Sequence, residues 1–339
     1  MDIKEKVVRT IKEHDLLKKG DKIVLGFSGG PDSTALLFAI SEYARANSWT
    51  VFPVHINHML RPGEAERDMK FSIDTAQKLC EDTDGSVKLC RCFTFDCGKL
   101  AAEQGMTTEE MGRKLRYEAY RTVAKEIGAD AIALAHNAGD QAETILFRIL
   151  RGTGTDGLSG MAYKRNDEGG IPIVRPLMDC TREEIEAYLE KNKIEFVTDS
   201  TNLEPVYQRN RIRLELLPYL AKEFNPNITE TLNRLGAIAA EDRDFIRDYA
   251  AEACEACVIE REEGKHVVLS RKVLEKLHNA VRFRVYNLCM KELGLESDVS
   301  RTHLLEIEKV RLSNNPRAWT PVVANYRVER DHDKLTFIK

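Results

Sequence analysis

The stretch VLGFSGGPDSTALLF (Val24–Phe38) constrains the fold more than any other part of the sequence. A short apolar run ends at two glycines, and an Asp and hydroxyl residues then open a second apolar run with helical spacing. The glycines permit positive φ and a close approach of a ligand to the backbone. The N-terminus of the following helix presents unpaired N–H groups and the positive end of the helix dipole. The stretch therefore predicts a strand, a tight loop and a helix that together bind an anion such as phosphate.

This loop has neither the lysine of G-x-x-x-x-G-K-[ST] nor the spacing of G-x-G-x-x-G. We therefore expect it to bind phosphate through backbone N–H groups and the hydroxyls of Ser28, Ser33 and Thr34. Asp32 would repel a bare phosphate, so its presence predicts a Mg²⁺ ion between the two. The alternative is a tight strand–helix turn in which Asp32 only faces the positive end of the helix dipole.

Strand and helix patterns alternate over the first two-thirds of the chain, which predicts right-handed crossovers and helices on both faces of a sheet. The expected fold class is α/β, with a doubly wound, mostly parallel five-stranded sheet. Thr181, with Glu184 three residues later, predicts the start of one of the helices by a capping box. The five predicted strands are 22–27, 50–58, 87–95, 131–136 and 173–177.

The alternation stops near Pro218–Pro226, after which the pattern is helical. We place a domain boundary near residue 222, which gives domains of residues 1–222 and 223–339. The second domain is expected to be smaller and mainly helical, and to begin with a helical linker. It is expected to end in a β-hairpin, because ANYRVERDHDKLTFIK alternates on both sides of Asp331–Asp333.

Several features of the composition narrow the class of protein. The N-terminal segment is charged from its second residue and lacks the apolar core of a signal peptide. No run of about 18 apolar residues occurs, so no membrane span is expected and the predicted location is the cytoplasm. Among the eight cysteines, only Cys254 and Cys257 form a C-x-x-C pair. We interpret this pair as buried thiols one helical turn apart rather than as a metal or redox site.

The distribution of charge is uneven. The net charge is −4, so the surface as a whole does not indicate nucleic-acid binding. Residues 265–291 differ, because they carry seven Lys or Arg against Glu275 alone. This run predicts either a basic patch for nucleic acid or a solvated helix face, and its composition does not decide between them.

Ser-Gly-Gly-x-Asp-Ser after a first strand resembles the pyrophosphate loop of the N-type ATP pyrophosphatases, which split ATP between its α and β phosphates. Further blocks are similar to those of one family with this loop, the tRNA(Ile)-lysidine synthetases, and follow in the same order. The resemblance implies an adenine nucleotide alpha hydrolase-like fold. Asn137 and Gly139 depart from the family pattern, in which a second His and an acid are usual. The blocks are VHINHMLRPGEAERD (Val54–Asp68), RKLRYEAY (Arg113–Tyr120), AHNAGDQAET (Ala135–Thr144), RILRGTGTDGLSGM (Arg148–Met161), RPLMDCTREEIEAYL (Arg175–Leu189) and the segment 199–220.

The resemblance implies an ATP-dependent ligase that joins free L-lysine to C2 of the wobble cytidine (position 34) in the CAU anticodon of tRNA(Ile). ATP would convert the C2 oxygen to an adenylate with release of pyrophosphate, and the ε-amine of lysine would then displace AMP. The product, lysidine, changes codon recognition from AUG to AUA. The implied cofactors are ATP and Mg²⁺, the implied partners are tRNA(Ile) and L-lysine, and the resemblance leaves both a monomer and a homodimer open.

The resemblance also implies roles for individual residues. Asp32 is the candidate Mg²⁺ ligand, and the expected catalytic set is Asp32, Asp140, Glu143, Arg113 and Arg116. The expected ATP contacts are Ser28, Gly29, Gly30, Asp32, Ser33, Thr34, His55, Asn57, His136, Arg151 and Gly152. The expected tRNA contacts are Arg148, Arg209, Asn210, Arg213, Arg271, Lys272, Arg282 and Arg284.

Asp140 and Glu143 are the candidates to hold lysine and accept its proton, since the free side chain has a pKa of about 10.4. They lie three residues apart on a predicted helix and so share one face. That helix follows the fourth strand, at the carboxyl edge of the sheet, where doubly wound folds bind ligands. In the alternative interpretation, Asp140 only caps the helix and Glu143 completes a capping box. Arg113 and Arg116 have a similar alternative as a solvated helix stripe.

Two rival functions fit the same loop. A tRNA thiolase needs catalytic cysteines in its ATP-binding domain, but Cys90, Cys92 and Cys97 lack the C-x-x-C spacing. A nucleotide-binding RNA adaptor without turnover would tolerate the departures at Asn137 and Gly139. Release of pyrophosphate that depends on tRNA and lysine separates the adaptor from the ligase.

Overall fold

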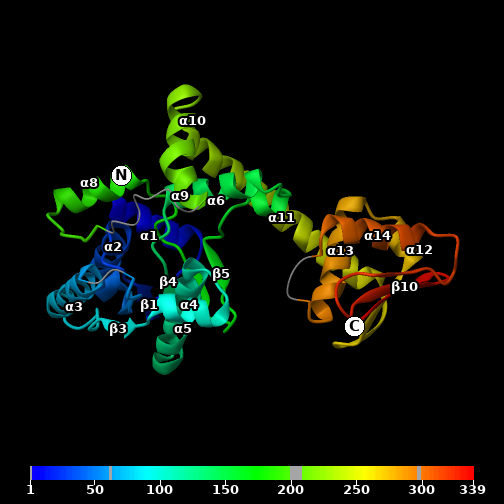
Figure 1. Cartoon of the computed structure of the whole chain (residues 1–339), viewed down its shortest axis with the longest axis horizontal. Helices are drawn as coiled ribbons and strands as arrows, with labels where there is room; N and C mark the ends of the chain where they lie inside the picture. The colour runs from blue at the N-terminus through cyan, green and yellow to red at the C-terminus, as the bar shows by residue number, and fades with distance from the viewer. Residues whose placement is uncertain (1, 61–62, 199–207, 296–298) are drawn as a thin grey trace. The chain divides into compact units, whose positions relative to one another are not determined.

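The computed structural model divides into two compact units, residues 1–237 and 238–339 (Figure 1). The division falls within helix α11 (Ile228–Cys257), whereas the expected boundary was residue 222. The first turns of α11 pack on the first unit through Leu232, and its last turns lie in the core of the second unit. The structure describes residues 2–60, 63–198, 208–295 and 299–339.

A six-stranded sheet in the order β3-β2-β1-β4-β6-β5 forms the centre of the first unit. All neighbouring strands are parallel except β5, which pairs antiparallel with β6. The prediction of a mostly parallel α/β sheet is confirmed, but the number of five strands was wrong. The extra strand β5 is short, polar and exposed, so no apolar alternation marks it. The strands are β1 (Lys22–Gly26), β2 (Thr50–Asn57), β3 (Arg91–Thr94), β4 (Ala131–Ala133), β5 (Lys164–Asn166) and β6 (Pro172–Val174).

Helices cover both faces of this sheet, as expected for a doubly wound fold. On one face α1, α2 and α8 share an apolar core with Ile23 of β1. On the other face Tyr117 and Val123 of α5 share a core with Val24 of the same strand, because successive residues of a strand point to opposite sides. The helical segments are α1 (Ile3–Glu13), α2 (Pro31–Asn47), α3 (Glu64–Asp82), α4 (Cys97–Gln104), α5 (Thr108–Ile127), α6 (Ala138–Leu150), α7 (Thr155–Leu158), α8 (Arg182–Lys191), α9 (Gln208–Arg211), the π-helical turn η2 (Ile212–Leu216) and α10 (Leu217–Glu223).

Capping boxes begin several of these helices, among them α5 and α8. The Thr107 hydroxyl accepts from Glu110 N at 3.2 Å, and the Glu110 carboxylate accepts from Thr107 N at 3.0 Å. Thr181 and Glu184 make the same two bonds at the start of α8, which confirms the predicted helix start. None of the helices that the structure describes is long and apolar enough to cross a bilayer.

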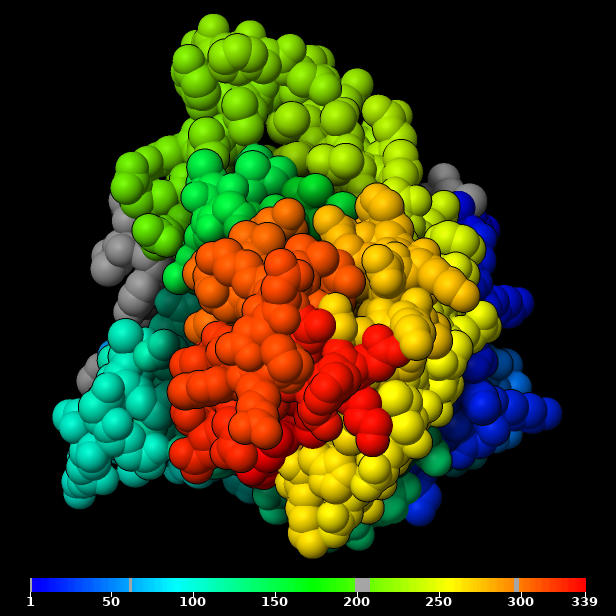
Figure 2. Space-filling model, turned by 90° about the vertical axis from the view of Figure 1, so that its right-hand side faces the viewer, coloured from blue at the N-terminus to red at the C-terminus, as the bar shows by residue number. Residues whose placement is uncertain are grey.

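The second unit contains a five-stranded antiparallel sheet in the order β7-β8-β11-β10-β9. The predicted terminal hairpin is confirmed, since β10 and β11 pair with Val328 opposite Phe337. Figure 2 shows the yellow segment with β7 and β8 beside the red segment with β10 and β11. The region is helical as expected, but the sequence indicated only the hairpin and not the whole sheet. Besides α11, its elements are β7 (Val258–Glu262), β8 (His266–Ser270), α12 (Arg271–Glu275), α13 (Asn279–Glu292), α14 (Arg301–Leu312), β9 (Trp319–Pro321), β10 (Arg327–Asp331) and β11 (Lys334–Ile338).

A buried ionic cluster joins α13 to α14. Arg282 Nη2 donates to Glu308 Oε1 at 3.0 Å, and Arg311 Nη2 donates to the same oxygen at 2.7 Å. The hydroxyl of Tyr286 donates to Glu308 Oε2 at 2.8 Å. Arg282 is only 8% exposed. The prediction that it contacts tRNA was therefore wrong, because its guanidinium is held in the core by a buried carboxylate and carbonyl oxygens such as that of Leu274.

Glu308→Gln should destabilise the second unit, because two buried guanidiniums would then lack a carboxylate. Removing one partner of a buried ion pair costs roughly 3–5 kcal/mol. Urea unfolding of the full chain, followed by circular dichroism, measures the change. The control is Glu306→Gln on the same helix, where an exposed pair with Lys309 is removed and a change within about 0.5 kcal/mol is expected. Equal stability of the two variants would contradict this role for Glu308.

Candidate active site

The loop between β1 and α2 has the conformation that its glycines predict. Gly29 has a φ of 83°, and a Cβ at this position would lie 2.9 Å from Val197 Cγ2. Both the backbone angle and the space therefore require glycine. Gly30 precedes Pro31, the first residue of α2, and no side chain caps this helix. The N–H groups at the start of α2 are thus not capped by a side chain, as an anion site requires.

The hydroxyls of Ser33 and Thr34 hold the loop from beneath. Ser33 Oγ donates to Gly30 O at 3.1 Å and accepts from Ser28 N at 3.2 Å. Thr34 Oγ1 donates to Gly29 O at 3.1 Å. Both side chains are buried, whereas Ser28 is exposed. Ser33 and Thr34 therefore satisfy loop carbonyls, whereas the contact of the exposed Ser28 hydroxyl with phosphate stays a prediction.

His55 and Asn57 also support the loop and its neighbouring strand. His55 Nδ1 lies 3.0 Å from Phe27 O and 3.0 Å from Ser72 Oγ. Burial lowers the pKa of His55, so the imidazole is neutral near pH 7. Asn57 Oδ1 accepts from Met59 N at 2.8 Å. Both residues, expected to contact ATP, are buried and bonded to protein groups, so the structure places them beneath the site.

Asp32 lies in the first turn of α2 and links the loop to two other elements. Asn137 Nδ2 donates to Asp32 Oδ1 at 3.0 Å, and Arg182 Nη1 lies 3.4 Å from Asp32 Oδ2. Burial raises the pKa of Asp32, and the charge of Asp140 adds to this effect, whereas Arg182 and Asn137 oppose it. Arg182 was not predicted as a site residue, because nothing near it in the sequence indicates a partner 150 residues away.

Asn137 is the N-cap of α6. Its Oδ1 accepts from Asp140 N at 3.1 Å, and Asp140 Oδ2 accepts from Asn137 N at 3.1 Å. The alternative in which Asp140 caps the helix was therefore wrong, since Asp140 is the acid that completes the capping box. A Cβ at Gly139 would lie 3.1 Å from Asn137 Oδ1. The two departures from the family pattern thus lie in contact, and the small residue leaves room for the capping amide.

Asp140 and Glu143 share one face of α6, as their spacing predicts, and two arginines neutralise them. Arg213 Nη2 donates to Asp140 Oδ1 at 2.7 Å and to Glu143 Oε2 at 3.1 Å. Arg209 Nε donates to Glu143 Oε2 at 3.3 Å. The side chain of Glu143 is only 3% exposed, so its charge needs a partner. Arg209 and Arg213, expected to contact tRNA, are instead held by these acids in this structure.

A histidine and several arginines lie near this acid pair. Burial lowers the pKa of His136 to about 4, and the charges of Arg175, Arg209 and Arg113 act in the same direction. Its buried Nδ1 has no hydrogen-bond partner among the described residues. Arg113 is exposed on α5 and stacks on Tyr117, with Cζ 4.9 Å from the ring centroid. His136 is thus neutral, and the ligand contacts expected of His136 and Arg113 stay predictions.

Other predicted residues lie away from the loop. Arg151 and Gly152 follow the last residue of α6, about 16 Å along the helix from Asp140 at a rise of about 1.5 Å per residue. Their predicted contact with ATP stays a prediction. Arg148 Nη1 donates to Gly157 O at 3.0 Å and to Gly160 O at 2.6 Å, so it holds the chain that follows α6.

The remaining predicted residues lie on α5, on α9 and in the second unit. Arg116 lies exposed on α5, where its charge helps to lower the pKa of His58. Asn210 is half-buried in α9. In the second unit Arg271 Nε donates to Arg311 O at 3.0 Å, and Lys272 is exposed. Residues 61–62 and 199–207, which belong to two of the resembling blocks, lie outside the described residues.

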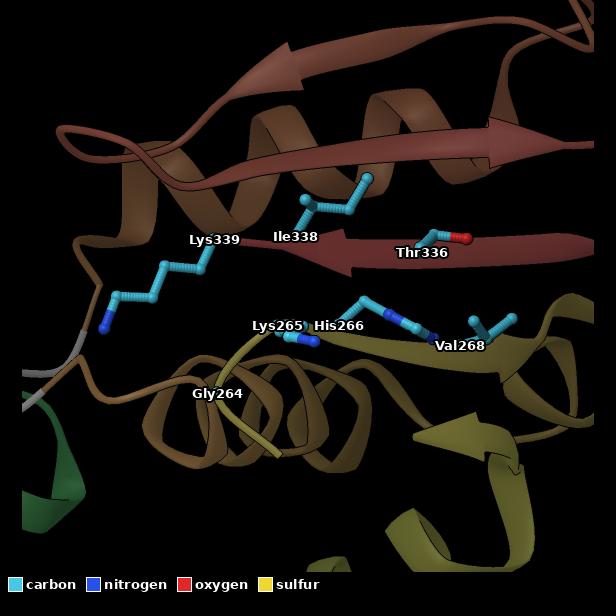
Figure 3. A pocket seen from close by; sticks show the side chains of 7 residues that line it. All are labelled: Gly264, Lys265, His266, Val268, Thr336, Ile338 and Lys339. Carbon is cyan, nitrogen blue, oxygen red and sulfur yellow. The ribbon is translucent and has the colours of Figure 1, made fainter. Parts of the chain in front are cut away.

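A separate hollow lies at the ends of β8 and β11 in the second unit (Figure 3). Two of its basic side chains already have partners, since His266 lies 3.4 Å from Glu260 and Lys265 pairs with Glu262. Lys265 and His266 therefore do not give the hollow an unpaired charge. It is lined by Gly264, Lys265, His266, Val268, Thr336, Ile338 and Lys339.

Comparison with known proteins places this site in a family. The model of the PP-loop domain matches residues 2–220. A tRNA(Ile)-lysidine synthase of Clostridioides difficile is 36% identical over 332 residues, which cover 98% of this chain and 69% of that protein. The chain belongs to the tRNA(Ile)-lysidine synthase family. Another family member, from Caldanaerobacter subterraneus, is 34% identical over 332 residues, with 92% of this chain and 68% of that protein covered.

A solved structure supports the fold alone. The U34-tRNA thiolase from Methanococcus maripaludis, determined with its [4Fe-4S] cluster, matches with a TM-score of 0.54 at 19% identity. The match covers 70% of this chain and 78% of the thiolase. In the part of the chain that the structure describes, no group of three or more His, Cys, Asp or Glu is placed to hold a metal ion. All eight cysteines are free thiols.

Gly29→Ala should abolish binding of pyrophosphate to the loop, because a Cβ at positive φ would also collide with Val197. Isothermal titration with inorganic pyrophosphate measures this. The control is Gly128→Ala at the end of α5, where φ is also positive, at 62°, but no atom lies within 4 Å of the added Cβ. Both variants should lose about 1 kcal/mol of stability, but only Gly29→Ala should lose the ligand. Unchanged pyrophosphate binding by Gly29→Ala would contradict the assigned loop.

Proposed function

We propose that this protein joins L-lysine to C2 of cytidine 34 in the CAU anticodon of tRNA(Ile), at the expense of ATP. The reaction passes through an adenylated cytidine and gives lysidine, AMP and pyrophosphate, so that the anticodon reads AUA instead of AUG. One observation carries the proposal: the glycine loop and the acid pair of α6 lie at one sheet edge, joined by the 3.0 Å bond from Asn137 to Asp32. Membership of the tRNA(Ile)-lysidine synthase family supports the same reaction.

The loop receives the pyrophosphate portion of ATP. Backbone N–H groups at the start of α2 and the exposed Ser28 hydroxyl donate to its oxygens. Mg²⁺, when bound, offsets part of the triphosphate charge. Asp32 is the candidate ligand, because its carboxylate lies in the first turn of α2 beside the loop. Burial raises the pKa of this carboxyl. A cation beside Asp32 would favour its ionised form.

The α-phosphate and the base oxygen are activated by the neighbouring cations. Arg113 and Arg116 lie on the same exposed side of α5, three residues apart. They stabilise the negative charge that develops on the α-phosphate during adenylation. Neutral His136 has an unpaired Nδ1 that can bond a ligand. These groups orient the nucleotide, and departing pyrophosphate remains in the loop.

Asp140 and Glu143 bind the ammonium group of lysine. The guanidinium of Arg213 now occupies their oxygens. Lysine therefore takes over a site built for a cation, and Arg213 must turn away as it enters. One carboxylate then accepts the proton that the ε-amine must lose before it attacks C2. The charge of the pair also retains the amino acid while AMP leaves.

The second unit is proposed to bind tRNA. Lys272 is well placed for phosphate, because its side chain is 78% exposed and its ion pair with Asp333 lies at the surface. Arg271 and Arg284 add positive charge to the second unit. Contacts of basic side chains with phosphate make tRNA binding depend on the salt concentration. A cytoplasmic location and a homodimer stay predictions.

Asp140→Asn and Glu143→Gln should separate the two half-reactions. Loss of either charge should lower lysine transfer by about 100-fold or more, as for loss of a general base. Release of pyrophosphate with tRNA and ATP should change much less. Transfer of radiolabelled lysine and release of pyrophosphate are measured on the same samples. The control is Glu215→Gln, whose exposed carboxylate pairs with Arg211 away from the acid pair. Equal loss of both half-reactions would refute a lysine-specific role.

The direct test is incubation with ATP, radiolabelled lysine and the minor isoleucine tRNA. Acid-stable label should appear in the wobble nucleotide after digestion of the tRNA. A transcript with uridine at the wobble position is the matched control and should remain unlabelled. Binding of tRNA and ATP without release of pyrophosphate would favour an RNA adaptor and contradict the proposed ligase.

A further inference from the structure

Tyr117 on α5 lies among three guanidinium groups. Arg113 Cζ is 4.9 Å and Arg165 Cζ is 5.7 Å from the centre of its ring. Arg175 is the third, and its charge interacts with Tyr117 and with both other arginines. The three come from different elements, because Arg165 lies on β5 and Arg175 directly follows β6. The fold thus gathers charge from residues far apart in the sequence around one aromatic ring.

No acid neutralises this cluster. Among the described residues, none of the three arginines is in an ion pair with a carboxylate, whereas Arg121 on the same helix pairs with Asp167 at 3.2 Å. Arg165 donates to the carbonyl of Asn166 and Arg175 to the carbonyl of Ala162, and Arg175 also bonds to Tyr117. Like charges held together without an acid favour the binding of an anion.

Arg175 shows that the cluster is built into the fold. It is 3% exposed, and its buried Nε has no hydrogen-bond partner among the described residues. Burial, together with the charges of Arg165 and Arg113, lowers the pKa of Arg175 to about 10, and Tyr117 opposes the shift. A buried guanidinium with an unused donor is costly unless a ligand satisfies it.

We propose that Arg165 and Arg175, next to Arg113, form a binding site for a backbone phosphate of the RNA beside the nucleotide that is modified. The proposal rests on the proposed function and adds Arg165 and Arg175 to its substrate contacts. Arginine suits phosphate because its planar fork can donate two hydrogen bonds. Phosphate contacts fix the register of an RNA without reading its sequence.

The phosphate belongs to RNA rather than to ATP for two reasons. The triphosphate of ATP already has donors in the glycine loop and at the start of α2. Arg165 and Arg113 are also exposed, on an edge strand and on the solvent side of a helix. An extended polyanion can reach such a position without entering the loop.

Arg165→Glu tests the contact, with Lys164→Glu as the matched control. Lys164 is the adjacent residue of β5 and carries the same charge, but its Nζ donates to Asp15 O at 2.5 Å. Binding of a tRNA(Ile) transcript with a CAU anticodon is measured by fluorescence anisotropy at several salt concentrations. Arg165→Glu should weaken binding and reduce the slope of log K against log salt by about one. Lys164→Glu should change the slope much less, and Arg165→Lys should restore part of the affinity.

Three outcomes would overturn the proposal. Wild-type affinity and slope in Arg165→Glu, or equal losses in Lys164→Glu, would show that Arg165 makes no specific phosphate contact. A raised KM for ATP with unchanged tRNA affinity would assign the cluster to the nucleotide. Because binding is measured without turnover, these outcomes are distinct from failure of the proposed ligation, which only the lysine-transfer assay reports.

Discussion

The hydrogen bond from the Asn137 amide to Asp32 joins the two parts of the site. Asn137 also caps α6 through Asp140 N, so one side chain fixes both the start of that helix and its position beside the phosphate loop. Because the acids of α6 are placed relative to this cap, their distance from the phosphate loop depends on it. The buried ends of parallel strands provide the rigid edge on which this contact is possible.

Charge is distributed unequally across this edge. On α6 the acids are neutralised by Arg209 and Arg213, which come from the segment that follows the sheet. Around Tyr117, by contrast, the guanidiniums of Arg113, Arg165 and Arg175 lie close together, and among the described residues none of them forms an ion pair with a carboxylate. A cationic substrate would therefore compete with Arg209 and Arg213 for the acids of α6. An anionic substrate would meet the arginines around Tyr117 without such competition. This arrangement suits an enzyme that brings an amino acid and a polyanion together.

Much of the site could be predicted because its geometry is local. The glycines and hydroxyls of the loop predicted a strand–turn–helix unit, and the three-residue spacing of Asp140 and Glu143 predicted their common face. The partners of the arginines could not be predicted in this way. Arg213 contacts an acid 70 residues away, and Arg282 lies in the core of the second unit. Both nevertheless have the sequence surroundings of surface arginines.

By itself the sequence determined the α/β class, the position of the phosphate loop, the terminal hairpin and the resemblance to a family, since each depends on residues close together in the chain. Only the tertiary structure decided that Ser33 and Thr34 turn inward, that Arg182 reaches Asp32 and that Arg165 joins Tyr117 from a strand without an apolar pattern. The physical reason is that a buried polar group must find its partner in space. That partner is set by the packing of whole elements, which spacing along the chain does not specify.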